Sequence, residues 1–309
     1  MRFLLPFFLP VLVSAALFPE TLGTAHRTEI HSVAISDQPL WDEYGLQASE
    51  QASYDSGGAP YTVIGYRLQD STGALAAFQW QRATQPKSGA VERLGNYVLI
   101  FQDRQPTPSE LGSLRGSLPR LEEGPLPSLP GYLPRSGMSP SSERYITGPV
   151  SLTKFYPGIA PSTAAFHLGA EAQSADFDSP GGPLKLAIFS YPTNDIARAR
   201  VAQFQKIAGA MTKRAGPLVA LILAPGDPNG AERLLSQVRY QASVTQGHRF
   251  PTPKDNVGAF MVNLFQLIGL LLVFCALSGL AVGGLRMILR RGGASGDGDQ
   301  MISLQIEKR

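Results

Sequence analysis

The chain has very few of the side chains from which metal and redox sites are usually built. Its 309 residues include one cysteine and four histidines. One thiol cannot form an internal disulfide or a multi-thiolate metal site, and four histidines leave little material for an imidazole cluster. The formal net charge of +3 is too small to indicate binding to nucleic acid. The composition therefore predicts no metal, no cofactor and no nucleic-acid partner.

Motifs typical of catalysis are also lacking. The sequence has neither a Gly-x-Ser-x-Gly nucleophile elbow nor a phosphate-binding Gly-x-x-x-x-Gly-Lys loop. His167 and His248 are the candidates for a general base beside a serine, and a surface or structural role is the favoured alternative. Asp176 and Asp178 could bind calcium, but the ordered loop of oxygen ligands is missing, which favours a hairpin turn. We therefore assign no catalytic, cofactor-binding or metal-binding residue.

The N-terminal 25 residues have the pattern of a secretory signal peptide. Residues 1–25 begin with Arg2, continue through a long apolar run, and end in Gly23-Thr24-Ala25, small residues that a signal peptidase accepts. We expect this segment to be cut before His26. A retained signal anchor is the alternative, although the run is short for a membrane span and contains two prolines.

A second apolar stretch predicts a transmembrane helix over residues 258–286. No charged residue occurs from Asn256 to Leu285, and about 26 helical residues at 1.5 Å each give about 39 Å, enough to span a bilayer with some tilt. A buried helix of a soluble protein is the alternative. Three arginines follow at once, which places the tail, residues 287–309, in the cytoplasm. We expect a single-pass protein of the bacterial inner membrane with its large domain exported.

Two short patterns in these C-terminal segments predict contacts with other molecules. Gly279 and Gly283 share one face of the helix and would let two helices approach closely, although such pairs also occur without a functional partner. In the tail, Ile302, Leu304 and Ile306 alternate with polar residues as in a strand. This tail is predicted to add to the sheet edge of a cytoplasmic partner, with a tail that binds nothing as the alternative.

The exported part contains an internal repeat. Asp55-Ser56-Gly57-Gly58 recurs as Asp178-Ser179 followed by Gly181-Gly182, which predicts the same hairpin turn in each copy. In both copies the two strand-like runs around this turn are followed by a helix, an apolar strand and a second helix. The helices after the hairpins are expected at 70–82 and 195–213, and the apolar strands at 97–101 and 218–223.

These patterns predict an α+β fold with two tandem α/β-sandwich-like copies and one C-terminal transmembrane helix. The copies cover residues 40–118 and 150–245, each with the order strand-strand-helix-strand-helix, and we expect them to pack as a pseudo-symmetric pair. Residues 119–149 are rich in proline, which favours an extended connector. A proline-rich ligand for a recognition module is the alternative for this segment.

Several residues in and between the copies resemble a known family. They are Trp41 with Tyr44-Gly45-Leu46, the run Glu50–Tyr54 and the segment Glu143–Pro149. With the repeat, they resemble an uncharacterised family of bacterial exported or envelope proteins, known as a domain of unknown function, over about residues 40–245. The resemblance implies a location in the bacterial envelope and no reaction or ligand.

Two functions from different classes fit the sequence. The favoured one is a membrane-anchored, non-catalytic binding or assembly module of the bacterial envelope, in contact with the lipid bilayer, with envelope proteins and with a second copy through its helix. The alternative is an exported hydrolase or transferase with a site at the junction of the two copies. A junction pocket joining His167 to a carboxylate and a hydroxyl would favour the enzyme, and a featureless junction would favour the module.

Overall fold

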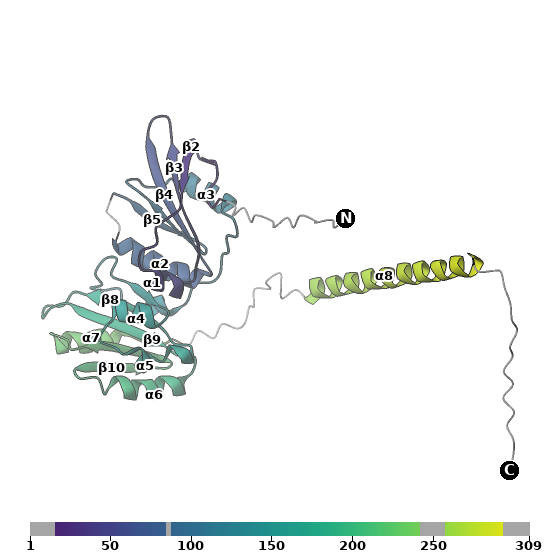
Figure 1. Ribbon diagram of the computed structural model, residues 1–309. Helices are drawn as coiled ribbons and strands as arrows, with labels where there is room; N and C mark the ends of the chain where they lie inside the picture. The colour runs from purple at the N-terminus through teal and green to yellow at the C-terminus, as the bar shows by residue number, and fades with distance from the viewer. Residues whose placement is uncertain (1–15, 85–87, 242–256, 293–309) are drawn as a thin grey trace, which may run out of the picture. The chain divides into compact units, whose positions relative to one another are not determined.

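The structure, a computed structural model, describes residues 16–84, 88–241 and 257–292. The chain divides into two compact units, the first ending at Gln241 and the second beginning at Ala242. In the described residues, the first unit contains two antiparallel sheets with their helices, and the second contains one long helix (Figure 1). The fold is therefore mixed α+β with an apolar C-terminal helix, which confirms the predicted class.

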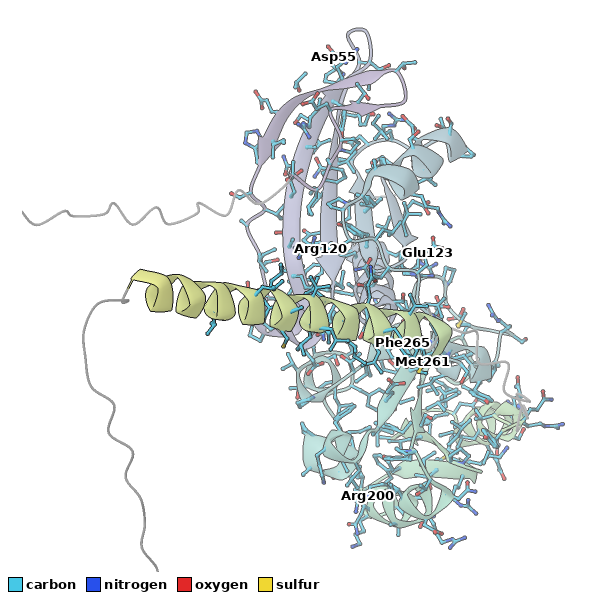
Figure 2. All side chains as sticks on the ribbon, turned by 90° about the vertical axis from the view of Figure 1, so that its right-hand side faces the viewer. Asp55, Arg120, Glu123, Arg200, Met261 and Phe265 are labelled. Atoms are coloured by element: carbon cyan, nitrogen blue, oxygen red, sulfur yellow. The ribbon has the colours of Figure 1, made fainter. Side chains whose placement is uncertain are left out.

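The first half of the first unit is built on a six-stranded sheet of order β1-β2-β3-β4-β6-β5. Asp55 lies at the tip of the hairpin between β3 and β4 (Figure 2), where its carboxylate accepts the Gly58 N–H at 2.7 Å and forms the predicted turn. The elements are β1 (Thr21–Leu22), β2 (Ala25–His31), α1 (Gln38–Glu43), β3 (Leu46–Asp55), β4 (Pro60–Leu68), α2 (Ser71–Thr84), β5 (Ala90–Leu94), β6 (Tyr97–Phe101) and α3 (Pro108–Ser117).

The second half is built on a five-stranded sheet of order β10-β11-β9-β8-β7. Its elements are β7 (Arg144–Ile146), α4 (Pro149–Phe155), α5 (Pro161–Ala164), β8 (Glu171–Phe177), β9 (Leu184–Ser190), α6 (Asn194–Phe204), β10 (Ala210–Ala215), β11 (Leu218–Leu223) and α7 (Pro228–Gln237). Two 3-10 turns, η1 (Leu129–Tyr132) and η2 (Phe166–Leu168), lie in the connecting segments. The proline-rich segment 119–149 thus ends in an edge strand of this sheet, because β7 pairs with β8.

The predicted five-element unit omits a strand in each half. From the first hairpin onward, both halves have the order strand-strand-helix-strand-strand-helix, and the strand orders β3-β4-β6-β5 and β8-β9-β11-β10 correspond. The omitted strands, β5 and β10, are edge strands with charged residues, and their sequences lack the apolar run typical of a central strand. The expected helix over 195–213 is therefore wrong, since α6 ends at Phe204 and Lys213 pairs with Ala220 in the sheet.

The two halves share one apolar cluster. It joins the face of the first sheet that carries α2 to the face of the second sheet that carries α7, and it includes α1 and η1. The corresponding helices, α6 and α3, lie instead in the two separate outer clusters. Non-equivalent faces thus meet at the junction, which contradicts the expected pseudo-symmetric packing. The two halves therefore use different surfaces to contact each other, as subunits do in a heterologous interface.

The boundary predicted for the signal peptide at residue 25 lies inside the folded unit. Leu17, Phe18, Leu22 and Ala25 are all buried in the outer cluster of the first sheet. The strand β2 also begins at Ala25 and pairs with β3. A cut before His26 would remove these side chains from the core, so their burial argues against that cleavage position.

The second unit consists, where the structure describes it, of α8 (Val257–Gly292). Its segment Leu264–Gly284 has a mean hydropathy of 2.3 and is long and apolar enough to cross a membrane. None of that segment is buried against protein, and Figure 2 labels Met261 and Phe265 near the start of the helix. An exposed apolar helix is not the core helix of a soluble domain, so the structure is consistent with a single-pass membrane protein.

Candidate functional site: the junction of the two halves

The strongest polar contact between the halves centres on the Glu43 carboxylate. Glu43 is the last residue of α1, and its carboxylate accepts the backbone N–H groups of Val150 at 2.6 Å and Ser151 at 2.9 Å. The hydroxyl of Ser151 also donates to it, and that of Thr147 does so at 3.4 Å. A carboxylate from the first half therefore caps the first turn of α4 in the second half, where N–H groups have no partner within the helix.

A glycine makes this close approach possible. Gly148 precedes α4, and a Cβ at this position would lie 2.5 Å from Oε2 of Glu43. Any larger residue would therefore displace the carboxylate from the N–H groups that it accepts. The sequence Thr147-Gly148-Pro149 thus serves the junction, with Pro149 at a position where the first turn of a helix tolerates the missing N–H.

Aromatic rings and a lysine extend the junction on the same side. Trp41 stacks on Tyr66 with centroids 4.2 Å apart and lies 5.2 Å from Trp80. The ammonium group of Lys154, from α4, lies 5.1 Å from the centre of the Trp80 ring and forms an ion pair with Asp37. A cation over a ring face is attracted by the ring electrons, so α4 is held to the first half by charge as well as by burial.

Two tyrosines carry hydrogen bonds through the buried part of the junction. The Tyr44 hydroxyl donates to the carbonyl of Tyr145 at 3.4 Å, and the Tyr145 hydroxyl donates to Oε2 of Glu171 at 2.5 Å. Burial raises the pKa of both tyrosines, and the neighbouring carboxylates of Glu43 and Glu171 raise it further. Both phenols therefore remain protonated and act as hydrogen-bond donors.

The junction contains a polar pocket of about 240 Å³. Its lining includes three carboxylates and three hydroxyls, those of Glu43, Asp70, Glu171, Tyr44, Thr72 and Thr147. Each carboxylate already accepts a hydrogen bond within the protein, for example Asp70 from the Gly73 N–H at 2.8 Å. This arrangement can receive a donor group, but its carboxylates are mainly used to hold the two halves together.

His167, one of the two histidines singled out in the sequence, does not line this pocket. His167 lies exposed on η2, and His248 lies outside the described residues. Asp176 and Asp178 flank the end of β8, where Asp178 accepts from the Ser139 hydroxyl at 3.3 Å. Within the part of the chain that the structure describes, no three acidic, imidazole or thiol groups are placed to hold a metal ion.

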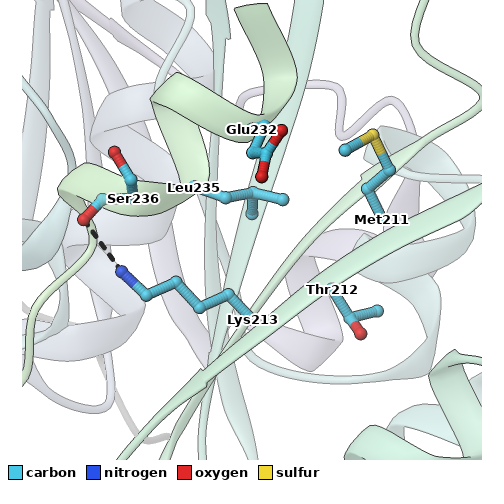
Figure 3. A pocket seen from close by; sticks show the side chains of 6 residues that line it. All are labelled: Met211, Thr212, Lys213, Glu232, Leu235 and Ser236. Atoms are coloured by element: carbon cyan, nitrogen blue, oxygen red, sulfur yellow. Dashed lines mark hydrogen bonds between the residues drawn. The ribbon is translucent and has the colours of Figure 1, made fainter. Parts of the chain in front are cut away.

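A second pocket lies between the edge strand β10 and α7 (Figure 3). It has a volume of about 390 Å³ and is lined by Met211, Thr212, Lys213, Glu232, Leu235 and Ser236. The ammonium group of Lys213 donates to the carbonyls of Ser236 at 2.8 Å and Val238 at 2.9 Å. Lys213 therefore caps the C-terminal end of α7, where carbonyl groups lack helical partners.

The helix-packing residues predicted in the membrane segment lie on an open face of α8. Apart from the backbone of α8 itself and the two chain neighbours, nothing in the described residues lies within 4 Å of a Cβ built at Gly279 or Gly283. This leaves room for a second helix, and the predicted self-association stays a prediction. The predicted tail residues Ile302, Leu304 and Ile306 lie outside the described residues.

Sequence reasoning missed Glu43, whose carboxylate accepts four hydrogen bonds from the second half. Its partners lie more than a hundred residues away in the chain, at separations of 104 to 108. The only local signal was the sequence Gly148-Pro149 at the start of a helix.

Comparison of the chain with family models, with curated proteins and with solved structures gives no match.

Proposed function

We propose that the protein is a membrane-anchored, non-catalytic binding or assembly module of the bacterial envelope. The observation that carries the proposal is the exposed apolar segment Leu264–Gly284, attached to a folded unit whose junction carboxylates are engaged in internal hydrogen bonds. The first feature supports anchoring in a bilayer, and the second supports a scaffold that presents surfaces. Partners in this proposal are the bilayer, envelope proteins and a second copy that contacts α8.

The orientation in the proposal follows from charge. Arg286, Arg290 and Arg291 follow the apolar segment, which favours a cytoplasmic C-terminus and an exported first unit in the bacterial inner membrane. The corresponding strand orders of the two halves support an origin of the exported unit by duplication of a six-element unit.

The anchoring part is tested by fractionation and protease accessibility. The full chain with a C-terminal tag should resist extraction by alkaline carbonate, and protease added to spheroplasts should digest the first unit and spare the tag. A variant with Leu271→Arg and Phe274→Arg should lose membrane retention, because each arginine costs about 2.5–3.5 kcal/mol at the centre of a membrane helix. A protected first unit with a digested tag would reject the orientation.

The binding part is tested by in-cell crosslinking. Crosslinked neighbours of the wild-type chain should be recovered from the membrane fraction and should be absent for the double arginine variant. If the wild-type chain and the double arginine variant were crosslinked to the same proteins, a membrane-dependent assembly role would be contradicted.

The competing proposal of a hydrolase or transferase has one supporting observation. The junction pocket brings carboxylates and hydroxyls together, among them Asp70, Glu171 and Thr147. The imidazole expected beside them, His167, lies elsewhere and is exposed. A fluorophosphonate probe, which labels activated hydroxyl nucleophiles, should leave the chain unlabelled. Labelling at Thr72 or Thr147 would favour the enzyme.

A further inference from the structure

Residues 17 to 19 are held by a set of polar groups on the first sheet. The N–H groups of Leu17 and Phe18 donate to the two carboxylate oxygens of Glu50, each at 3.0 Å. The Arg27 guanidinium donates to the Phe18 carbonyl, and the Tyr54 hydroxyl donates to the Pro19 carbonyl at 2.7 Å. We call Glu50, Arg27 and Tyr54, with Gly65, the N-terminal clamp.

Gly65 provides the space in which Phe18 lies. It pairs directly with Glu50 across β3 and β4, and a Cβ at Gly65 would lie 2.7 Å from Cζ of Phe18. The Phe18 side chain is only 2% exposed, and Leu17 beside it is 5% exposed. By contrast, Ala16 is exposed. Among the described residues, which begin at Ala16, Leu17 is therefore the first that the fold encloses.

The sequence before Leu17 has the three parts of a short signal peptide. Arg2 supplies the positive charge, residues 3–13 supply the apolar run, and Ser14-Ala15-Ala16 supply small residues at the positions that a signal peptidase reads. This cut leaves every residue of the clamped segment in the mature protein. The cut before His26 would instead empty the space over Gly65 and remove Leu22 from the core.

We propose that a signal peptidase cleaves the Ala16–Leu17 bond and that the new amino terminus stays bound to Glu50. Water adds across this peptide bond, leaving a carboxylate on Ala16 and an ammonium group on Leu17. That nitrogen lies 3.0 Å from Oε2 of Glu50, so the amide–carboxylate hydrogen bond becomes an ammonium–carboxylate ion pair, in which donor and acceptor are both charged. The inference rests on the proposed export of the first unit.

The cut is tested by sequencing the N-terminus of the full chain purified from membranes of an exporting host. The expected first residues are Leu-Phe-Pro-Glu, Leu17 to Glu20. A start at His26, at Ala16 or at Met1 would overturn the proposal. Protease accessibility of the first unit, measured on the same cells, separates the two hypotheses. An accessible unit with another start rejects this cut alone, whereas an inaccessible unit also rejects the proposed export.

The bound amino terminus is tested with Glu50→Gln in two forms of the chain. One form is processed, and the other is made without residues 1–15 with Ala16→Met as its first residue, so that an amide nitrogen remains at Leu17. Both are purified in the same detergent. The substitution should lower the unfolding temperature by at least about 3 °C more in the processed form, because only that form loses an ammonium–carboxylate contact. Equal losses in the two forms would show that no charged terminus contacts Glu50.

Raising the pH gives a second test. If Glu50 had only a structural role, the extra loss of unfolding temperature in the processed form would not depend on pH in this range. An α-ammonium group loses its proton near about pH 8. Contact with the Glu50 carboxylate raises this pKa in the folded chain. The extra loss caused by Glu50→Gln in the processed form should therefore be full below about pH 8 and should shrink as the pH rises through the folded-state value, toward about pH 10. Its persistence there would contradict the contact. The Arg27 guanidinium, which donates to the Phe18 carbonyl, is present in both forms of the chain, so it does not produce a difference between them.

Discussion

The Glu43 carboxylate accepts the Val150 N–H at 2.6 Å and so joins a helix of the first half to a helix of the second. Because Ser151 donates a second N–H to the same carboxylate at 2.9 Å, removing Glu43 leaves two backbone donors without their partner. An unsatisfied, partly buried donor costs about 1–3 kcal/mol.

Glu43→Ala should therefore lower the free energy of unfolding of the full chain by about 2–4 kcal/mol. Trp41 and Trp80 both lie at the junction, so tryptophan fluorescence during denaturant unfolding in detergent reports on this loss. Glu29→Ala is the matched control, because that side chain is 65% exposed and forms an ion pair with His31, which is itself exposed. Similar changes for the two variants would contradict a structural role for Glu43.

Two helical glycines should respond in opposite directions to alanine. A Cβ at Gly73 in α2 would lie 2.1 Å from the Tyr44 carbonyl oxygen, whereas nothing lies within 4 Å of one at Gly112 in α3. Gly73→Ala should destabilise the chain by about 1–3 kcal/mol through overpacking. Gly112→Ala should stabilise it by up to about 1 kcal/mol through helix propensity. Thermal unfolding followed by circular dichroism should show a lower unfolding temperature for the first variant and a higher one for the second.

Stability should fall in acid because of a carboxylate at the start of α3. Burial acts to raise the pKa of Glu110, but hydrogen bonds from the Thr107 N–H at 2.7 Å and the Arg104 guanidinium at 2.6 Å outweigh it and lower the pKa. A lowered folded-state pKa means that the stabilisation is present above the unfolded-state pKa and is lost as pH falls through the folded-state value.

The unfolding temperature should therefore drop between about pH 5 and about pH 3, and Glu110→Gln should reduce the size of that drop. Asp227, the N-cap residue of α7, should also lose its stabilising effect in acid, because its pKa is lowered by the Ser179 hydroxyl and then by the Gly230 N–H. Glu29→Gln is the control and should leave the acid dependence unchanged. An unaltered drop in the Glu110 variant would exclude this carboxylate as its source.

Self-association through α8 can be read out with the single cysteine of the chain. Cys275 lies four residues before Gly279 and is exposed, so it shares the face of Gly279 and Gly283. Oxidation in membranes should give a disulfide-linked dimer, and Gly279→Ile with Gly283→Ile should reduce its yield several-fold. Gly269→Ile, elsewhere on the same open helix, should not. Equal yields in all three chains would place the contact on another face.

Sequence patterns predicted the central elements because their signals are local. The apolar runs 97–101 and 218–223 are β6 and β11, and the turn at Asp55 joins β3 and β4. The edge strand β10 was assigned to a helix because Ala208 and Met211 continue the helical spacing of α6. Gly209, between them, has a φ of 71°, a left-handed conformation that a continuous helix does not contain, and α6 itself ends earlier, at Phe204.

The candidate site was much less predictable than the fold. Glu43, Gly148 and Tyr145 acquire their roles from partners in the other half, and a single sequence contains no signal for such long-range pairs. The N-terminal boundary of the folded unit was hard to predict for the same reason. Small residues at 23–25 satisfied the pattern for cleavage, while the burial of Phe18 over Gly65 depends on a strand that comes much later in the chain.

The shared apolar cluster also affects how the chain is made. Trp41 and Trp80, in the first half, belong to the same buried cluster as Leu218 and Ile222 of β11. The first half is synthesised before the second, and transiently exposed apolar surface makes incomplete chains prone to aggregate. We therefore expect a nascent first half to expose its part of this cluster until the second half has been synthesised.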